Sequence, residues 1–215
     1  MKTSEMTKKR PRGRPRGFDH DEVLDAAVLV FWEKGYDGAS VEDLTKAMGI
    51  NRPSLYSTFG NKRELFIQAI DRYAATHGNR AFSAFRLEPD NRKAVERFFA
   101  ASIECATEDG KPRGCLINTV ATEAAENDDA LRHKLSRMFT KTDAAIARRL
   151  QANQEGAAPG IDDPEGLARM AHSVTHSIMT RARAGAGHEE LTDIADTFMT
   201  VLFPQPQNQP PTTRT

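Results

Sequence analysis

The stretch Ser40–Leu65, SVEDLTKAMGINRPSLYSTFGNKREL, decides how the first third of this chain folds. Ser40 is a favourable N-cap for a short helix with apolar residues at helical spacing, and Gly49 suits the left-handed position that ends such a helix. Asn51 is the next N-cap, and Pro53 falls in the first turn, where a missing N–H costs little. The stretch therefore predicts two short helices joined by a tight turn.

Two short helices across a glycine turn are typical of the helix-turn-helix, whose second helix enters the major groove of DNA. We expect these helices over about 41–48 and 52–58, with Arg52 reaching phosphates or guanine edges. Pro53 disfavours helical dihedrals at Arg52, so the second helix could begin one residue later. The residues of the motif that we expect to contact DNA are Ser40, Arg52, Pro53, Ser54, Tyr56 and Ser57.

Not every side chain of the second helix is expected to contact DNA alone. Tyr56 has two possible roles, and two apolar side chains are assigned to the core. The hydroxyl of Tyr56 can bind a phosphate, or its ring can pack in the core, and both roles can coexist. Leu55 and Phe59 recur at helical spacing and are predicted to be core residues.

Residues around the motif extend the pattern in both directions. They are the frame Tyr56-x-x-Phe59-x-x-Lys62-x-x-Leu65, the turn Gly49-Ile50-Asn51, and Phe31–Gly35 followed by Tyr36. On these residues, the segment from about Phe18 to Tyr73 resembles the DNA-binding domain of the TetR/AcrR family of bacterial repressors. The resemblance implies that Lys62 binds a phosphate, that the rest of the chain senses a small molecule, and that two copies form a dimer.

Length and composition indicate neither a membrane-spanning nor a secreted protein. The 215 residues allow one or two domains, and a formal net charge of zero says nothing about partners. We see no apolar run long enough for a membrane span and no apolar segment of a secretory signal. Two cysteines do not make a disulfide framework. We therefore expect a cytoplasmic protein without a membrane partner.

The first 17 residues form a basic arm, with seven lysines and arginines against the single acid Glu5. Within it, Arg12-Gly13-Arg14-Pro15 resembles the core of an AT-hook, and Arg12, Arg14 and Arg16 could enter a narrow minor groove. Plain attraction to phosphates and a solubilising tail are the alternatives. The Pro/Gln/Thr-rich residues 204–215 are predicted to be a disordered tail.

Between these ends we predict an all-α protein. Residues 18–77 are expected to form the helix-turn-helix domain, with a first helix from Asp19 to Gly35, a core face that includes Trp32, and a fourth helix from Lys62 that Gly78 breaks. Residues 78–203 are expected to form a helical ligand-binding and dimerisation domain. Its predicted helices cover about 91–107, 115–125, 128–154 and 163–184, and a last helix follows Gly185.

Residues 78–203, the body of the chain, contain candidate residues for a ligand pocket and for a dimer interface. For the ligand pocket we expect mainly apolar side chains from several helices: Phe99, Ile103, Cys115, Ile117, Val120, Met138 and Phe139. The resemblance implies that the last two helices pack against a second copy, although they could instead close the core of one copy. Their candidate interface residues are Leu167, Met170, Val174, Ile178, Leu191, Ile194, Phe198 and Leu202.

Cys115 follows Lys111 and Arg113 and begins a predicted helix, an environment that stabilises a thiolate. Gly114-Cys115-Leu116 also resembles members of the family that respond to electrophiles or oxidants, and a plain pocket residue is the alternative. A disulfide with Cys105, otherwise a core residue, has no support in the sequence.

His172 and His176 lie four residues apart, a spacing that can chelate a metal. We instead expect a solvated or dimer-rim face, because no further ligand is placed to complete a site. The acids Glu123, Glu126, Asp128 and Asp129 are expected to cap helices or face solvent. No cofactor or metal is predicted.

These observations favour a ligand-responsive repressor that binds a palindromic operator as a homodimer and leaves it when a small molecule, electrophilic or oxidising in one version, binds the body. An architectural DNA-binding protein without a sensor is the alternative. An enzyme with Cys115 as nucleophile is disfavoured, because no catalytic partner is placed beside it.

Overall fold

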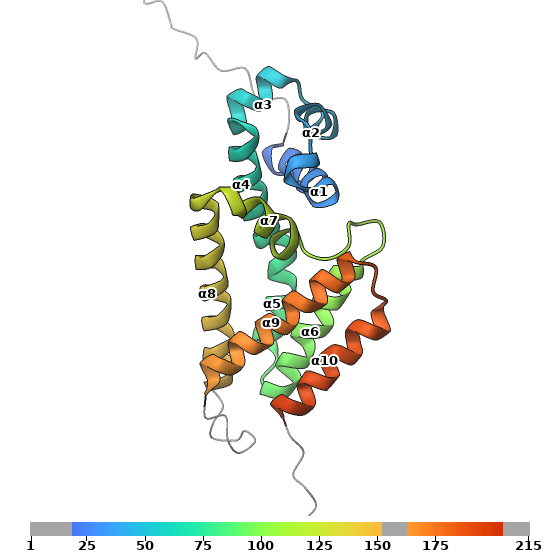
Figure 1. The fold of residues 1–215 in the computed structure, drawn as a ribbon, viewed down its shortest axis with the longest axis vertical. Coiled ribbons are helices and arrows are strands. Elements are labelled where there is room, and N and C mark those ends of the chain that lie inside the picture. The colour runs from blue at the N-terminus through green and yellow to red at the C-terminus, as the bar shows by residue number, and fades with distance from the viewer. Residues whose placement is uncertain (1–18, 152–162, 204–215) are drawn as a thin grey trace, which may run out of the picture.

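The computed structural model describes residues 19–151 and 163–203, and these residues form helices joined by short loops, without a strand. The predicted all-α class is confirmed. A small group of helices, α1 to α4, occupies one end, and helices α6, α8, α9 and α10 form the body at the other (Figure 1). The predictions for 1–17, with Arg12, Arg14 and Arg16, and for 204–215 lie outside the described residues.

The helices of the N-terminal end are α1 His20–Gly38, α2 Val41–Met48, α3 Arg52–Phe59 and α4 Lys62–Tyr73. A π-helix, η1 Ala74–Gly78, leads into α5 Asn79–Leu87, and the body continues with α6 Asn91–Thr107. The following short segments are η2 Leu116–Ala121 (π), α7 Thr122–Ala124 and η3 Ala125–Asn127 (3-10). The last three helices are α8 Asp129–Gln151, α9 Pro164–Arg183 and α10 His188–Leu202.

Caps define the helix-turn-helix as the sequence predicts. Ser40 and Asp43 form a reciprocal capping box at the start of α2, and Gly49 ends that helix in the left-handed region at φ 64°. Asn51 accepts a hydrogen bond from the N–H of Ser54 at 2.8 Å. Helix α3 begins at Arg52, so Pro53 does not delay it.

The predicted stop at Gly35 is also present. Its φ of 77° and ψ of 170° interrupt the helical dihedrals, and one further turn follows up to Gly38. A residue with a side chain rarely adopts a positive φ, so glycine is required at this break.

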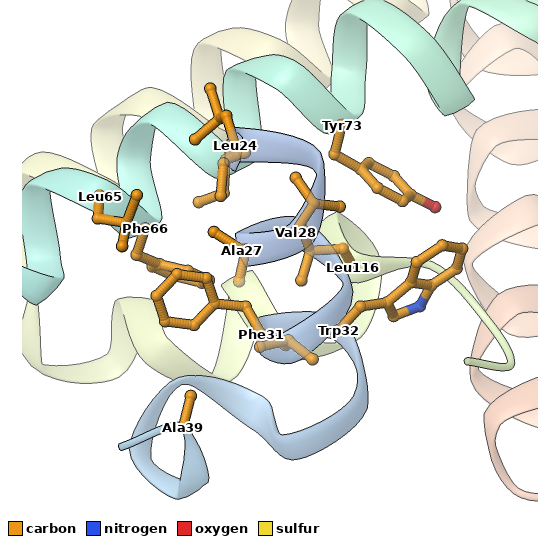
Figure 2. Close-up of a cluster of buried hydrophobic side chains, with 14 of the residues drawn as sticks. Leu24, Ala27, Val28, Phe31, Trp32, Ala39, Leu65, Phe66, Tyr73 and Leu116 are labelled. Carbon is orange, nitrogen blue, oxygen red and sulfur yellow. The ribbon is translucent and has the colours of Figure 1, made fainter. Parts of the chain in front are cut away.

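A core of large side chains holds α1 to α4 together. Phe31, Trp32 and Phe66 are fully buried, and the ring of Tyr36 lies 4.8 Å from that of Phe66 (Figure 2). Leu55 and Phe59, on the inner side of α3, are buried as predicted. This core fixes the direction in which α3 presents its outer side.

The predicted break at Gly78 is wrong. Gly78 has right-handed helical dihedrals, and α4 continues through the π-helix η1 into α5, a helix that the sequence analysis missed. Phe85 of α5 is buried against the body, which supplies the tertiary contact that overrides the low helix propensity of glycine. One run of helical turns therefore connects the two ends, and we call its part before α5, which is α4 and η1, the connecting helix.

Most of the predicted body helices are confirmed. Helix α6 has the predicted bounds, and α8 ends at Gln151, the last described residue before a gap. Segment η2 of the body packs into the core of the N-terminal helices, where Leu116 is fully buried (Figure 2). The two ends of the molecule therefore share apolar contacts in addition to the connecting helix.

Candidate nucleic-acid interface and internal cavity

Helix α3 has one buried and one exposed side. Leu55 and Phe59 face the core, whereas Arg52, Pro53 and Ser57 are exposed and Ser54 is half-buried. Tyr56 is 51% exposed, so its ring is not a core residue. The outer side of α3 thus presents a guanidinium, hydroxyls and a phenol, the groups that contact DNA phosphates and base edges.

Ser40 lies at the N-terminus of α2, and its hydroxyl is already engaged. It donates to Asp43 Oδ2 at 2.7 Å and accepts from the N–H of Asp43 at 3.0 Å. Hydrogen bonds from Lys34 and then from Ser40 lower the pKa of Asp43 to about 2. A phosphate beside Ser40 would therefore bind the N-terminus of α2 more than the hydroxyl of Ser40.

Lys62 lies beside the end of α1. Its Nζ is 4.7 Å from the centre of the Tyr36 ring and 3.4 Å from the carbonyl oxygen of Asp37. The ring and the carbonyl hold the ammonium group at the start of α4, on the same end of the molecule as α3. This position is compatible with a phosphate contact.

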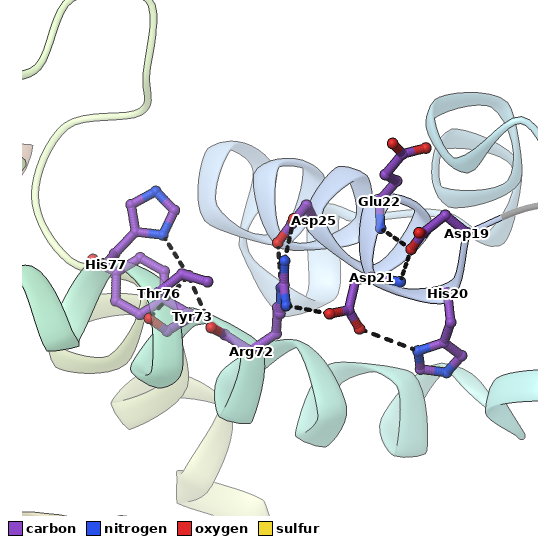
Figure 3. Close-up of polar contacts among 9 residues, drawn as sticks. All are labelled: Asp19, His20, Asp21, Glu22, Asp25, Arg72, Tyr73, Thr76 and His77. Carbon is purple, nitrogen blue, oxygen red and sulfur yellow. Dashed lines mark hydrogen bonds and ion pairs between the residues drawn. The ribbon is translucent and has the colours of Figure 1, made fainter.

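A charged network fixes α4 against α1 (Figure 3). Arg72 binds both carboxylate oxygens of Asp25 at 2.7 Å and one oxygen of Asp21 at 2.7 Å. Such bidentate pairs add geometric specificity. The network therefore fixes the position of α1, which shares the core of the helix-turn-helix, relative to α4, which leads to the body.

The body contains a cavity of about 310 Å³ between the connecting helix and helices α5, α6, α8 and α9. Four of the seven predicted pocket residues line it: Cys115, Ile117, Met138 and Phe139. Phe99 and Ile103 face α10 instead and line a smaller hollow of about 180 Å³. Val120 packs into the core beneath the N-terminal helices.

Several cavity residues were missed by sequence reasoning. Tyr73 and His77 come from the connecting helix, Phe82 and Arg86 from α5, and Thr175 and Met179 from α9. The assumed break at Gly78 hid α5, and the helical spacing of Phe82 and Phe85 was the signal that could have revealed it.

Cys115 lines this cavity, but its environment does not favour the thiolate. Burial raises the pKa of the Cys115 thiol, although hydrogen bonds from Tyr73 and from the N–H groups of Asn118 and Ile117 act in the opposite direction. Arg113 bonds to the carbonyl oxygens of Ala182 and Ala186 and does not face the sulfur. The expectation of a thiolate stabilised by nearby cations is therefore wrong.

Aromatic rings connect the cavity to the N-terminal core. The Tyr73 and His77 rings, which line the cavity, are stacked at 4.9 Å, and the Trp32 ring meets both edge-on at 5.0 and 5.3 Å. Arg183, near the end of α9, donates to the carbonyl oxygens of Trp32 at 2.5 Å and Glu33 at 3.3 Å. The cavity wall and α1 are therefore in direct side-chain contact through Tyr73 and His77.

The histidine pair does not lie on a solvated rim. His172 Nδ1 is 2.6 Å from Asp143 Oδ1, and the Nε2 atoms of His172 and His176 are 3.2 Å apart. Burial, and then the neighbouring His172, lower the pKa of His176 to about 4. Both rings also meet the edge of Phe139, so the pair faces α8 inside the body.

The eight candidate interface residues divide into two groups by burial. Ile178, Leu191, Phe198 and Leu202 are buried in the core of a single copy, which is the alternative that the sequence analysis left open for them. Met170 is 51% exposed, and Leu167, Val174 and Ile194 are half-buried. Val201 on α10, which is not among the eight candidates, is 66% exposed.

Within 19–151 and 163–203, no three histidine, cysteine, aspartate or glutamate side chains come together as metal ligands. In the same ranges, no helix is both long and apolar enough to cross a membrane.

Comparisons with known families give two matches along the chain. Residues 23–69 match the model described as bacterial regulatory proteins, tetR family. Residues 92–197 match the C-terminal domain of transcriptional regulators that are LmrA/YxaF-like. The first match covers the helix-turn-helix, and the second covers most of the helices around the cavity.

Individual relatives match over nearly the whole chain. The HTH-type transcriptional repressor ComR of Escherichia coli is 34% identical over 202 residues, covering 92% of this chain and 94% of ComR. The uncharacterised HTH-type regulator YezE of Bacillus subtilis is 32% identical, covering 88% and 99%. A solved structure of the TetR family regulator CifR, a cysteine mutant complexed with 26-bp double-strand operator DNA, has a TM-score of 0.80 at 32% identity and covers 86% of this chain and 98% of that chain.

Proposed function

Since this chain belongs to the TetR family of bacterial regulatory proteins, we propose that it is a transcriptional repressor that binds operator DNA through α3 and is released by a small molecule. The outer side of α3 carries the proposal, because its exposed polar residues stand on a rigid core. The repressor named ComR and the operator complex of CifR, both more than 30% identical to this chain, support the assignment.

The proposed repressor is a homodimer, since one helix-turn-helix gives few base contacts and a two-fold pair reads two half-sites. The exposed sides of α9 and α10 support this arrangement. Met170 of α9 and Val201 of α10 are large apolar side chains with half or more of their surface in solvent, and Ile194 of α10 is half-buried. A second copy would cover these residues.

The proposed response to ligand uses the cavity of about 310 Å³. Its wall includes Tyr73 and His77 of the connecting helix, and both rings contact Trp32 beneath the helix-turn-helix. A ligand that fits only one arrangement of this wall favours one spacing of the two recognition helices, and acts through its difference in affinity for the two states.

An electrophilic or oxidising effector is a narrower form of the proposal. Cys115 lines the cavity, and the Tyr73 hydroxyl and two backbone N–H groups bond to its sulfur, so donors to a thiolate are already in place. A reagent must enter the cavity to reach the thiol, and because burial raises the pKa of this thiol, the reactive thiolate is scarce at neutral pH.

The test is selection of bound duplexes from a random DNA pool at moderate salt, with the full chain and with a chain lacking residues 1–17. A palindromic consensus is the expected result. If deletion of the arm removes only a flanking A·T preference, the arm reads the minor groove. Salt-sensitive binding without a consensus would contradict the proposal and favour an architectural DNA-binding protein.

A further inference from the structure

The charged side chains that line the cavity all have one sign. Arg86 comes from α5 and Lys141 from α8, and no aspartate or glutamate is among the lining residues. Both cations are exposed, whereas most of the wall is buried or half-buried, so they lie where the cavity opens to solvent. The opening is therefore a site of positive charge.

These two cations also lack the carboxylate partners that their neighbours have. In the described part of the chain, Arg86 donates only to neutral oxygens, at 2.9 Å to Asn79 and 3.4 Å to Ser83, and Lys141 makes no ion pair. By contrast, Arg80 pairs with Glu108 at 2.9 Å. The positive charge at the opening is thus left for an external anion to neutralise.

The interior behind the opening is apolar and rich in aromatic rings. The Phe82 and Phe98 rings lie 5.3 Å apart, and Met138, Ile117 and Met179 add apolar surface to a wall that also includes a few polar side chains such as Ser102 and Thr175. The volume of about 310 Å³ is that of roughly ten water molecules, enough for a chain of about ten carbons or a small ring system. A ligand without an apolar body would leave this surface unfilled.

We propose that the cavity takes an amphipathic carboxylate, whose apolar body fills the aromatic interior and whose head group binds beside Arg86 and Lys141. The inference rests on the proposed ligand response of the same cavity and names its chemical class. Guanidinium and ammonium groups bind carboxylates through charge-assisted hydrogen bonds, and an apolar body held in the cavity would keep the carboxylate beside them. An organic cation would bring a like charge to two unpaired cations, and a neutral ligand would leave them unused.

The experiment compares three ligands that share one apolar body: decanoate, 1-decanol and decyltrimethylammonium, each below its micelle concentration. Binding to the full chain is measured by calorimetry and by the fluorescence of Trp32, the single tryptophan of the chain, whose ring contacts two cavity residues. We expect decanoate to bind about tenfold more tightly than 1-decanol, with the cation weakest. Equal or tighter binding of 1-decanol or of the cation, or no binding of any of the three, would overturn the assignment.

A charge-matched pair of variants locates the effect. The double variant Arg86→Gln/Lys141→Gln is expected to bind decanoate and 1-decanol equally within about twofold, with its affinity for 1-decanol unchanged. The control, Lys93→Gln/Arg148→Gln, loses the same two charges at exposed positions outside the cavity lining and should keep the tenfold preference. If the first variant retains the preference, the head group binds elsewhere and the inference is wrong.

A second measurement separates this inference from the proposed function. Operator binding is measured with and without saturating decanoate. If decanoate binds with the expected preference but leaves operator affinity unchanged, the ligand class stands and the proposed release fails. If another compound releases the operator while decanoate shows no preference over 1-decanol, the proposed function stands and the ligand class fails.

Discussion

At the scale of single residues, Gly114 shows how one backbone position sets the wall of the cavity. Its φ is 81°, and a Cβ there would lie 2.7 Å from the carbonyl oxygen of Met179 on α9. Its N–H donates to the carbonyl oxygen of Ala106 at 2.9 Å, so the chain is fastened between α6 and α9. A Cβ at residue 114, or a backbone shift that makes room for it, would therefore lower the stability of the fold.

We therefore expect Gly114→Ala to lower the free energy of unfolding by about 2–4 kcal/mol, from the left-handed conformation and the forced contact together. The control is Gly110→Ala in the same loop, where φ is 74° but nothing lies within 4 Å of a Cβ. That change should cost about 1 kcal/mol. Urea unfolding followed by circular dichroism measures both, and equal losses would show that the contact with Met179 does not matter.

The residues on the outer side of α3 should differ in what they contribute to operator binding. Arg52→Ala is expected to reduce affinity for the selected consensus about 10- to 100-fold, with less effect on random DNA, if its guanidinium reads a guanine. Tyr56→Phe should weaken both by a similar small factor, because a phosphate contact carries no sequence information. Fluorescence anisotropy with both duplexes measures this, with Lys93→Ala on α6 as the remote control.

An equal loss for Arg52→Ala on both duplexes would assign this side chain to a phosphate instead. A Tyr56→Phe variant that loses specificity would place the phenol at a base edge.

At the scale of elements, the N-terminal helices were predictable and the cavity was not. The caps at Ser40 and Asn51 and the glycines at 35 and 49 are local signals, because each is satisfied within a few residues along the chain. The cavity depends on which sides of α5, α8 and α9 meet, and that choice is made by tertiary packing.

Helix α9 shows how that choice divides one predicted stripe. The spacing of Leu167, Met170, Val174 and Ile178 predicts a single apolar face, expected to pack against a second copy, with closure of the core of one copy as the alternative. The structure buries mainly small side chains instead, among them Ala168, Ala171 and Ala182, which allow close approach of neighbouring helices, and leaves Met170 exposed. On the same helix, His172 and His176 are half-buried and contact Phe139 of α8.

The half-buried histidine pair, His172 and His176, should make the body sensitive to acid. His176 has a pKa of about 4, below its ordinary value near 6.5, because burial and His172 disfavour its charged form. Between these pH values the unfolded chain binds more protons, so stability falls as pH falls from 6.5 toward 4. We expect His176→Gln to flatten this part of the curve of melting temperature against pH.

The control for this prediction is His133→Gln, since His133 is an exposed histidine of α8. It should leave the pH dependence of the wild type unchanged. If His176→Gln retains the full loss of stability between pH 6.5 and 4, other groups cause it, and Asp143 beside His172 is the first to test.

At the scale of the whole molecule, the two ends are joined in three ways. Helix α4 runs through η1 into α5, segment η2 shares the core of the N-terminal helices, and polar bridges cross between them. One bridge is Arg63 with Asp128, which lowers the pKa of Asp128 to about 2 through its hydrogen bonds. The body therefore contacts α1 and α4 directly, and the proposed ligand response has these contacts to act through.

Arg183 is the bridge whose loss should be most informative. Its guanidinium binds the carbonyl oxygens of Trp32 and Glu33, just before the break at Gly35, where a cation is favoured by the carbonyl end of the helix. We expect Arg183→Gln to free the end of α1 without unfolding the body, so that amide hydrogen exchange over residues 31–39 becomes about tenfold faster.

The matched control is Arg181→Gln, two residues away, because Arg181 pairs with Glu190 at 3.0 Å between α9 and α10 and does not contact the N-terminal helices. Exchange in that variant should change only at the junction of these two helices. Equal acceleration over 31–39 in both variants would mean that the end of α1 responds to the general stability of α9. Acceleration in Arg183→Gln alone would show that this guanidinium holds the end of α1 in place against α9.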